Sequence, residues 1–297
     1  MLTLAIPYYR RLDYLRLAID SVRRQTSSRW QLIVSDDGCV EPGAEQLVAS
    51  YHDPRLLYAI SANPLGMVGN WNRCLDLSQN DLVTILHADD ELSPHYVETM
   101  QKAAEQHPDA AAFFCRAEVV NAQGKPVFSL PDSIKGLLRP SFKPYATLQG
   151  EQAVRRLARG NFIFCPALCY RKSLLDGTRF DDTWQMVQDL EFTTRLLFQG
   201  KTLIGLPETA YRYRRHGENA SETYTRSLLR FEEEITLLKQ ISEQAESLGW
   251  KSAARAARQA NIVKLHLLYR ILLDTTSLRF QPARTKLDLL QRLFMKS

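Results

Sequence analysis

Hydrophobic and polar positions follow two kinds of pattern along the first third of the chain. Short apolar runs rich in branched side chains predict buried strands, and longer stretches with apolar residues at helical spacing predict amphipathic helices. The predicted strands are residues 2–6, 31–35, 56–60 and 82–86, and the predicted helices are 12–25, 44–51, 66–77 and 94–107. This alternation of strand and helix predicts an α/β fold with a mostly parallel sheet and helices on both faces.

The pattern changes in the middle of the chain. The elements expected there, in order, are a strand at 111–120, a hairpin turn at 121–124, an antiparallel return at 127–130, a proline-rich surface loop at 131–144, a helix at 146–159, a strand at 162–170, a helix at 187–198 and a short strand at 203–206. After residue 224 the apolar positions keep helical spacing. The last part of the chain is therefore predicted to be entirely helical.

Polar residues directly follow three of the predicted strands. They are Pro7-Tyr8-Tyr9 after the first strand, Asp36-Asp37-Gly38 after the second and Asp89-Asp90 after the fourth. In open α/β sheets, ligands bind at the carboxyl ends of the strands. We therefore expect these residues to gather at one binding edge.

The two adjacent acids, Asp89 and Asp90, carry the strongest chemical signal. Their like charges repel at close range, and a divalent cation shared with ligand phosphates would offset that cost. Mg²⁺ and Mn²⁺ suit such oxygen ligands. The alternative is a solvated turn whose acids favour the start of the next helix. On these two residues alone, both interpretations stay open.

Composition narrows the class of protein only a little. The chain has 297 residues, of which 45% are hydrophobic and 24% charged, values that are ordinary for a globular protein. A net charge of +5 permits an anionic partner without selecting one. No apolar run approaches the roughly 18 residues that span a bilayer, and the N-terminus lacks the basic segment of a signal peptide. The five cysteines mostly lie in apolar contexts, which favours reduced thiols and a cytoplasmic protein.

Five sequence segments follow one another in a characteristic order along the first part of the chain. They are AIPYYRRLDYL at 5–15, SVRRQT at 21–26, IVSDDG at 33–38, NPLGMVGNWN at 63–72 and HADDELSP at 87–94. Together they resemble the family 2 glycosyltransferases, which are inverting enzymes of the GT-A fold. The resemblance implies a GT-A domain over residues 1–221, with a nucleotide-sugar-binding half at 1–110 and an acceptor-side half at 111–221. Residues 222–297 would form an α-helical C-terminal extension.

The resemblance also implies a set of donor-binding residues. Asp37 would accept a hydrogen bond from the nucleobase, with Pro7 and Tyr8 lining the same pocket. The other donor-side residues would be Asn63, Asn70, Asn72, His87 and Asp89. A plain turn for Asp37 and helix capping for the asparagines are the alternatives. His87 stands where many relatives carry the first acid of a D-x-D triplet.

Metal and catalytic roles follow from the same resemblance. Asp90 and Asp89 would ligate a divalent metal, Mn²⁺ or Mg²⁺, and His216 would reach the metal or the diphosphate. Asp189 would be the catalytic base that takes the proton of the acceptor hydroxyl. The alternatives are that Asp189 only opens its helix, that Glu191 is the base, and that His216 is structural.

The implied activity is metal-dependent transfer of a hexosyl or hexosaminyl group from a UDP-, GDP- or dTDP-sugar. The acceptor would be a glycan or a polyprenyl-linked glycan in the synthesis of a bacterial-type surface polysaccharide. A sugar nucleotidyltransferase is disfavoured because no glycine-rich basic loop follows the first strand. A basic lipid- or nucleic-acid-binding module would leave the ordered acids without a purpose, and we expect no nucleic-acid partner. The basic helical tail has three open interpretations: a packed bundle, peripheral contact with the inner face of the cell membrane, or an oligomer contact.

Overall fold

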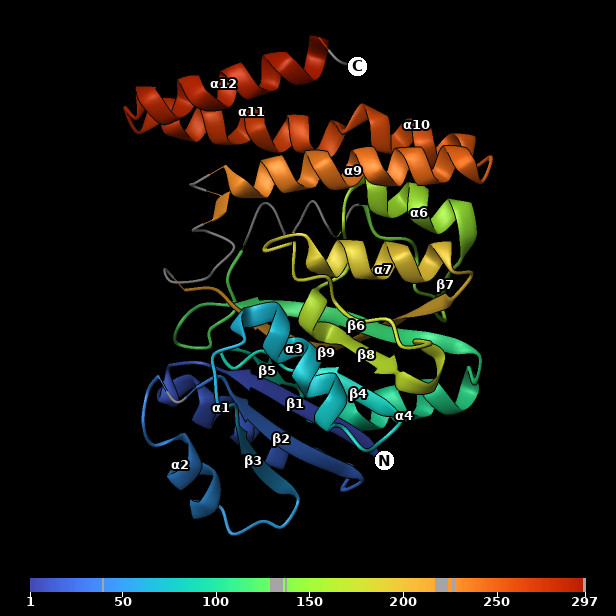
Figure 1. Cartoon of the computed structure of the whole chain (residues 1–297). Helices are drawn as coiled ribbons and strands as arrows, with labels where there is room; N and C mark the ends of the chain where they lie inside the picture. Colours follow the sequence, from blue (N-terminus) through green and yellow to red (C-terminus); the bar gives the residue numbers. More distant parts are fainter. Residues whose placement is uncertain (39, 129–135, 137, 217–223, 226–227, 296–297) are drawn as a thin grey trace. The chain divides into compact units, whose positions relative to one another are not determined.

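The computed structural model describes residues 1–38, 40–128, 136, 138–216, 224–225 and 228–295. The chain divides into two compact units, shown in Figure 1. The first unit comprises Met1–Gln149 and Phe162–His216, and the second comprises Gly150–Asn161 and Gly217–Ser297. The expected functional boundary at residue 221 stays a prediction.

One sheet forms the centre of the first unit. Its strands are β1 (Leu2–Tyr8), β2 (Trp30–Asp36), β3 (Leu56–Ile60), β4 (Leu82–Ile85), β5 (Glu91–Leu92), β6 (Ala110–Val120), β7 (Ala146–Leu148), β8 (Leu168–Arg171) and β9 (Thr202–Arg214). Hydrogen bonding gives the order β3-β2-β1-β4-β8-β6-β9-β5, and β7 also pairs with β9. Strands β3, β2, β1 and β4 are parallel, so their carboxyl ends lie at one edge. The predicted mostly parallel sheet is confirmed.

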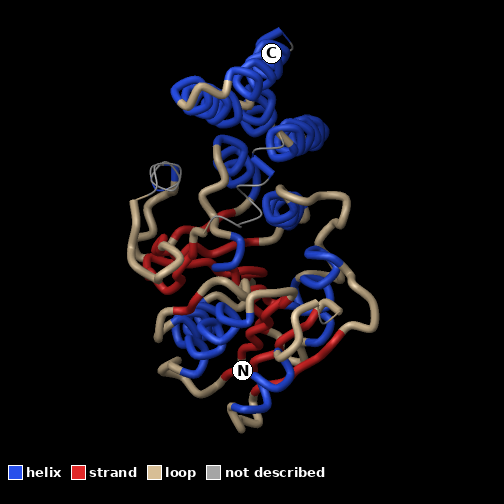
Figure 2. Tube along the Cα trace, turned by 90° about the vertical axis from the view of Figure 1, so that its left-hand side faces the viewer, coloured by secondary structure: helices blue, strands red, loops and turns tan. Residues whose placement is uncertain are grey.

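Helices cover both faces of this sheet (Figure 2). The helices of the first unit are α1 (Leu12–Arg23), α2 (Ala44–Ser50), α3 (Gly66–Leu77), α4 (Tyr96–Gln106) and α7 (Gln188–Phe198). Residues of α1 and α4 pack in one core cluster with Cys169 of β8. The next residue, Tyr170, contacts Phe192 of α7 with ring centroids 5.4 Å apart. Because successive side chains of a strand point to opposite faces, α7 lies on the face opposite to α1 and α4.

The second unit is helical throughout its described residues. Its helices are α6 (Gly150–Arg159), α9 (Leu229–Ser247), α10 (Lys251–Gln259), α11 (Asn261–Thr276) and α12 (Phe280–Met295). Glu151 of α6 accepts hydrogen bonds from the backbone and side chain of Ser252, which opens α10. The expected helical tail is therefore confirmed in the described residues.

Three element predictions differ from the structure. Residues 146–148 form β7, and the helix begins only at Gly150, after Gln149. The predicted strand at 162–170 is reduced to β8, which follows a short 3-10 helix at Cys165–Ala167. The predicted short strand at 203–206 is part of the longer β9, whose register with β6 is irregular around Pro207. Proline has no N–H for a ladder, so its presence concealed the continuity of the strand.

The predicted hairpin return is present as far as the structure describes it. The N–H of Val127 donates to the carbonyl of Val119 at 3.0 Å, and Val120 forms an antiparallel bridge with Pro126. The rest of the return and much of the proline-rich loop, residues 129–135 and 137, lie outside the described residues.

Candidate functional site

Asp37 lies at the carboxyl edge of the sheet and binds the start of α3. Its Oδ1 accepts the N–H of Leu65 at 2.6 Å, and its Oδ2 accepts the N–H of Gly66 at 2.9 Å. The side chain therefore satisfies N–H groups that a helix N-terminus leaves unpaired, and its charge suits the positive end of the helix dipole. A carboxylate oxygen can accept more than one hydrogen bond, so these contacts leave capacity for a ligand N–H.

Tyr8 is buried at the end of β1, and Pro7 beside it is half-buried. The Tyr8 hydroxyl lies 3.4 Å from Oε2 of Glu41, which also accepts the backbone N–H of Arg11 at the start of α1. Glu41 is a residue that the sequence interpretation missed, since nothing in its local pattern shows that it reaches β1 and α1. Asn63 is exposed on the loop between β3 and α3.

The two asparagines of α3 make well-defined structural contacts. Asn70 is buried, donates to the carbonyl of Ser35 at 2.9 Å, and accepts the Ser35 hydroxyl at 2.6 Å. Asn72 exchanges two hydrogen bonds of 2.9 Å with the backbone of Phe180. These contacts attach α3 to the sheet and to the segment that precedes α7. A donor contact by either amide stays a prediction.

Asp90 lies at the centre of the turn that follows β4. Its Oδ1 accepts the backbone N–H of Arg214 at 2.7 Å, and its Oδ2 accepts the hydroxyl of Tyr211 at 2.8 Å. Burial, followed by the neighbouring charge of Asp89, raises the pKa of Asp90 well above its usual range. Two donors therefore hold this carboxylate in an environment that disfavours its negative charge. A bound cation would offset that cost.

Asp89 is bound by the histidine at the end of β9. Nε2 of His216 lies 2.9 Å from Oδ2 of Asp89, and the histidine ring lies 5.1 Å from that of Tyr14. Burial alone would raise the pKa of Asp89, but the hydrogen bond to His216 and the nearby histidine charges outweigh it and lower the pKa. The two adjacent acids thus have pKa values shifted in opposite directions.

His87 joins these acids in a donor set that fits a divalent cation. Ligand atoms of His87, Asp89 and Asp90 all lie within 4.8 Å of one another. Nδ1 of His87 is 3.9 Å from Oδ2 of Asp90, and its buried Nε2 has no hydrogen-bond partner among the described residues. Trp71 stacks on the imidazole at 5.3 Å. The two carboxylates supply the oxygen ligands that Mn²⁺ and Mg²⁺ take, as expected from the sequence.

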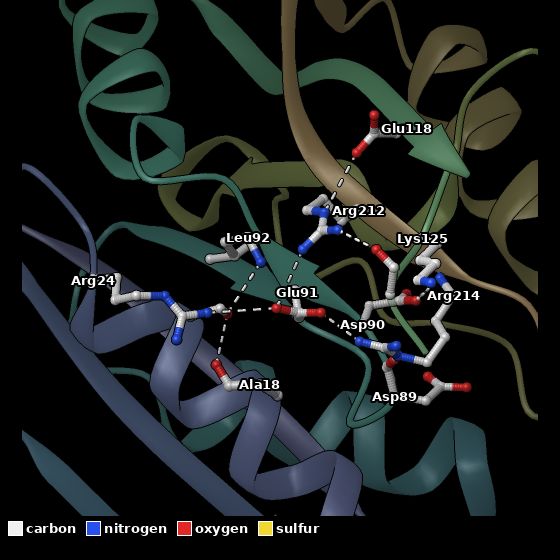
Figure 3. Close-up of polar contacts among 12 residues, drawn as sticks. Ala18, Arg24, Asp89, Asp90, Glu91, Leu92, Glu118, Lys125, Arg212 and Arg214 are labelled. Carbon is white, nitrogen blue, oxygen red and sulfur yellow. Dashed lines mark hydrogen bonds and ion pairs between the residues drawn. The ribbon is translucent and has the colours of Figure 1, made fainter. Parts of the chain in front are cut away.

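A buried ion-pair network stands next to the acid turn (Figure 3). Glu91 pairs through Oε1 with Arg214, and its Oε2 lies 3.4 Å from Arg24 and 3.5 Å from Arg212. Arg214 also donates from Nε to the carbonyl of Asp89 at 2.8 Å. The sequence interpretation gave Glu91 no role, because its arginine partners are remote in the chain.

Asp189 lies in the first turn of α7 and is half-buried. Burial, followed by the nearby charges of Cys165 and Asp189, raises the pKa of Tyr170 well above its usual range. Glu191 is engaged elsewhere, in an ion pair of 2.7 Å with Arg195. Burial raises the pKa of Glu191 although Arg195 acts in the other direction. Asp189 and Glu191 are the acids in the first turn of α7, and Glu191 is the one that pairs with Arg195 of the same helix.

Acids and a histidine gather at the carboxyl edge of a mostly parallel sheet, the edge at which open α/β folds bind their ligands. Residues 3–172 match the model described as Glycosyl transferase family 2, and the chain belongs to this family. The glycosyltransferase GlyA of Streptococcus pneumoniae is 24% identical over 252 residues, which cover 82% of this chain and 36% of that protein. The putative colanic acid biosynthesis glycosyl transferase WcaA of Escherichia coli is 26% identical over 200 residues, 67% of each chain.

Solved structures show the same fold at low sequence identity. Staphylococcus aureus TarS 1-349 in complex with UDP-GlcNAc has a TM-score of 0.63 at 15% identity, covering 98% of this chain and 91% of TarS. The mannosyltransferase PcManGT of Pyrobaculum calidifontis in complex with GDP-Man and Mn²⁺ has a TM-score of 0.59 at 15% identity, covering 99% and 84%. The expected GT-A fold, followed by C-terminal helices, is confirmed.

Proposed function

We propose that the protein transfers a sugar, with inversion at the anomeric carbon, from a nucleoside diphosphate sugar to a hydroxyl of a glycan or lipid-linked glycan. The observation that carries this proposal is the buried Asp90 beside Asp89, directly after a central parallel strand. Two donors orient Asp90, and His87 completes a cation-binding donor set around the pair.

The donor is a nucleotide sugar whose base contacts Asp37, Pro7 and Tyr8. The UDP-GlcNAc and GDP-Man complexes of the two similar structures support this class of donor. Asn63, Asn70 and Asn72 belong to the same loop and helix, and Asn63 is the exposed one. We therefore expect Asn63 to contact the nucleoside directly, and the amides of Asn70 and Asn72 to shape the pocket behind it.

Asp89 and Asp90 would hold a divalent cation, with His87 and His216 beside it. The Mn²⁺ in the PcManGT structure supports this assignment. A bound cation would neutralise charge on the departing nucleoside diphosphate. Asp189 takes the proton of the acceptor hydroxyl while the acceptor oxygen attacks the anomeric carbon from the face opposite the leaving group.

The acceptor belongs to a surface polysaccharide, as the name of the relative WcaA suggests. Helices α11 and α12 and the turn between them carry exposed apolar and basic side chains: Leu265, Leu268, Leu272, Leu278, Arg279, Phe280, Arg284, Leu287 and Arg292. Such a mixture suits peripheral contact with an anionic cytoplasmic membrane surface, and a contact between two copies is the alternative. In the described part of the chain, no helix has the length and apolar character needed to cross a membrane.

Thermal-shift measurements with UDP, GDP, dTDP and CMP, each with Mn²⁺ or EDTA, test the proposal. We expect one nucleotide to stabilise the protein with Mn²⁺, and EDTA to abolish that effect. Asp90→Ala should remove nucleotide-dependent stabilisation without unfolding the protein. Asp76→Ala is the matched control, because Asp76 is exposed and its ion-pair partner among the described residues is Arg179 at 2.7 Å. Donor binding that survives in Asp90→Ala with EDTA present would refute the metal assignment.

A further inference from the structure

Two arginines in the acceptor-side half approach one buried aromatic ring. Cζ of Arg116, on β6, lies 5.7 Å from the ring centroid of Phe142, and Cζ of Arg139 lies 5.2 Å from it. Both guanidinium groups are half-buried. Neither makes an ion pair or a side-chain hydrogen bond with any residue that the structure describes. Phe142 is therefore their shared partner, through cation–π contacts.

This arrangement is unfavourable as it stands. Nε of Arg116 is buried and has no hydrogen-bond partner among the described residues. Burial and the charge of Arg116 lower the pKa of Arg139, so the two groups repel each other. A guanidinium stays protonated at neutral pH, and a cation–π contact offsets only part of the cost of placing two like charges together. An oxyanion beside the two guanidinium groups would offset the repulsion between their charges.

The arginine pair lies on the face of the sheet that carries α7. Phe142 contacts both Arg116 and Phe114 of β6, so these two residues of β6 point to the same face. Ala112, two residues before Phe114, pairs with Tyr170, which packs against Phe192 of α7. Helix α7 also carries Asp189, the proposed base.

The pair also lies toward the catalytic edge. β4 is antiparallel to β8, and β8 is antiparallel to β6, so β6 runs in the same direction as β4. Arg116 is in the second half of β6 and is thus displaced toward the edge where Asp89 and Asp90 follow β4. The arginines are on the acceptor side of that edge, across the sheet face from the nucleoside pocket after β1 and β2.

We propose that Arg116 and Arg139 bind a phosphate or carboxylate group carried by the acceptor. The inference rests on the proposed function and names the chemical class of its acceptor: an anionic glycan or a phosphate-linked lipid glycan. Planar guanidinium forks match the oxygens of both groups, and the buried ring of Phe142 restricts the two forks. Bound in this way, the anion fixes the acceptor on the face of Asp189, and a neutral acceptor lacks this anchor.

Equilibrium binding to the whole chain tests the inference. Mn²⁺ and whichever of UDP, GDP, dTDP and CMP stabilises the protein are present at saturation, so that the donor site is filled. The probes are geranyl phosphate, trigalacturonate and, as the neutral reference, maltotriose. We expect one anionic probe to bind about tenfold more tightly than maltotriose, and the difference to shrink as salt is raised. Preference for geranyl phosphate indicates a phosphate-bearing acceptor, and preference for trigalacturonate indicates an acidic sugar.

Variants locate the binding site. Arg116→Gln and Arg139→Gln should each remove about tenfold of the anionic affinity, and Arg116→Lys, which keeps the charge but loses the fork, should lose less. Arg29→Gln is the control, because Arg29 is exposed at the start of β2, at the opposite edge of the sheet. Circular dichroism verifies that each variant is folded.

Two results would overturn the inference: anionic probes that bind the wild type no better than maltotriose, or glutamine variants that bind them like the wild type. Failure of the proposed function gives a different result. In that case none of the four nucleotides binds the wild type, and titrations of the same anionic probes without nucleotide still decide whether the arginine pair binds oxyanions.

Discussion

Replacing Glu91 by glutamine should destabilise the first unit, because this carboxylate is buried among three arginines. Losing one partner of a buried ion pair costs about 3–5 kcal/mol. Arg24 is 58% exposed and Arg212 29% exposed, so water screens their ion pairs with Glu91 and reduces what these pairs contribute to stability. Arg214 is only 1% exposed but keeps hydrogen bonds to the carbonyls of Asp89 and Ala122. We therefore expect the lower end of the range, about 3 kcal/mol.

For a unit of this size, that loss corresponds to a fall in melting temperature of about 6–12 °C. Calorimetry and urea unfolding, followed by circular dichroism, measure it in Glu91→Gln. Glu118→Gln is the matched control: Glu118 is 42% exposed and pairs with Arg212 at 3.4 Å, so its loss should cost less than about 1 kcal/mol. If Glu91→Gln melts no lower than Glu118→Gln, the Glu91 ion pairs drawn in Figure 3 do not stabilise the first unit.

Three further predictions test other parts of the molecule. Asp189→Asn should lower kcat by about 10²–10⁴ with little change in donor affinity, whereas Glu191→Gln should be mild; the reverse outcome moves the base to Glu191. Burial lowers the pKa of His266 from 6.5 to about 3 in the folded protein. As pH drops from 6.5 to 3 the histidine is protonated in the unfolded chain before it is in the folded one, so the free energy of unfolding should fall over this range. His266→Phe should remove that acid sensitivity in melting curves. Anionic vesicles should retain the protein at low salt, and deletion from residue 280 should weaken this; equal retention by neutral vesicles would contradict the electrostatic contact.

The sheet was predictable where each strand carries its own signal. Strands β1 to β4 are apolar runs separated by amphipathic helices, and each burial pattern follows from local sequence. β9 behaves differently because its segments pair with different partners: Leu203 with β7, and Tyr211 with β5. A strand whose neighbours change along its length, and which contains Pro207, has no uniform periodicity to recognise.

The acids of the candidate site were predictable from the sequence, but the residues that position these acids were not. Asp37, Asp89 and Asp90 follow strands directly, so the sequence order alone brings them to one edge. Asp37 also caps α3, a structural role that agrees with the alternative interpretation of this residue as part of a plain turn. One carboxylate can do both, since a cap occupies one lone pair of each oxygen and leaves the other for a ligand.

The acid turn depends on residues that no local motif could reveal. Tyr211 and Arg214 contact Asp90 over separations of 121 and 124 residues, and His216 contacts Asp89 over 127 residues. The end of β9 therefore sets where the two carboxylates point, and β5 keeps it there by pairing Glu91 with Arg212 and Leu92 with Tyr211. Because the turn carries repelling charges, it would relax if these contacts were absent. The cation site that we propose at this short acidic motif therefore depends on a distant strand, because β9 supplies the donors that fix the geometry of the turn.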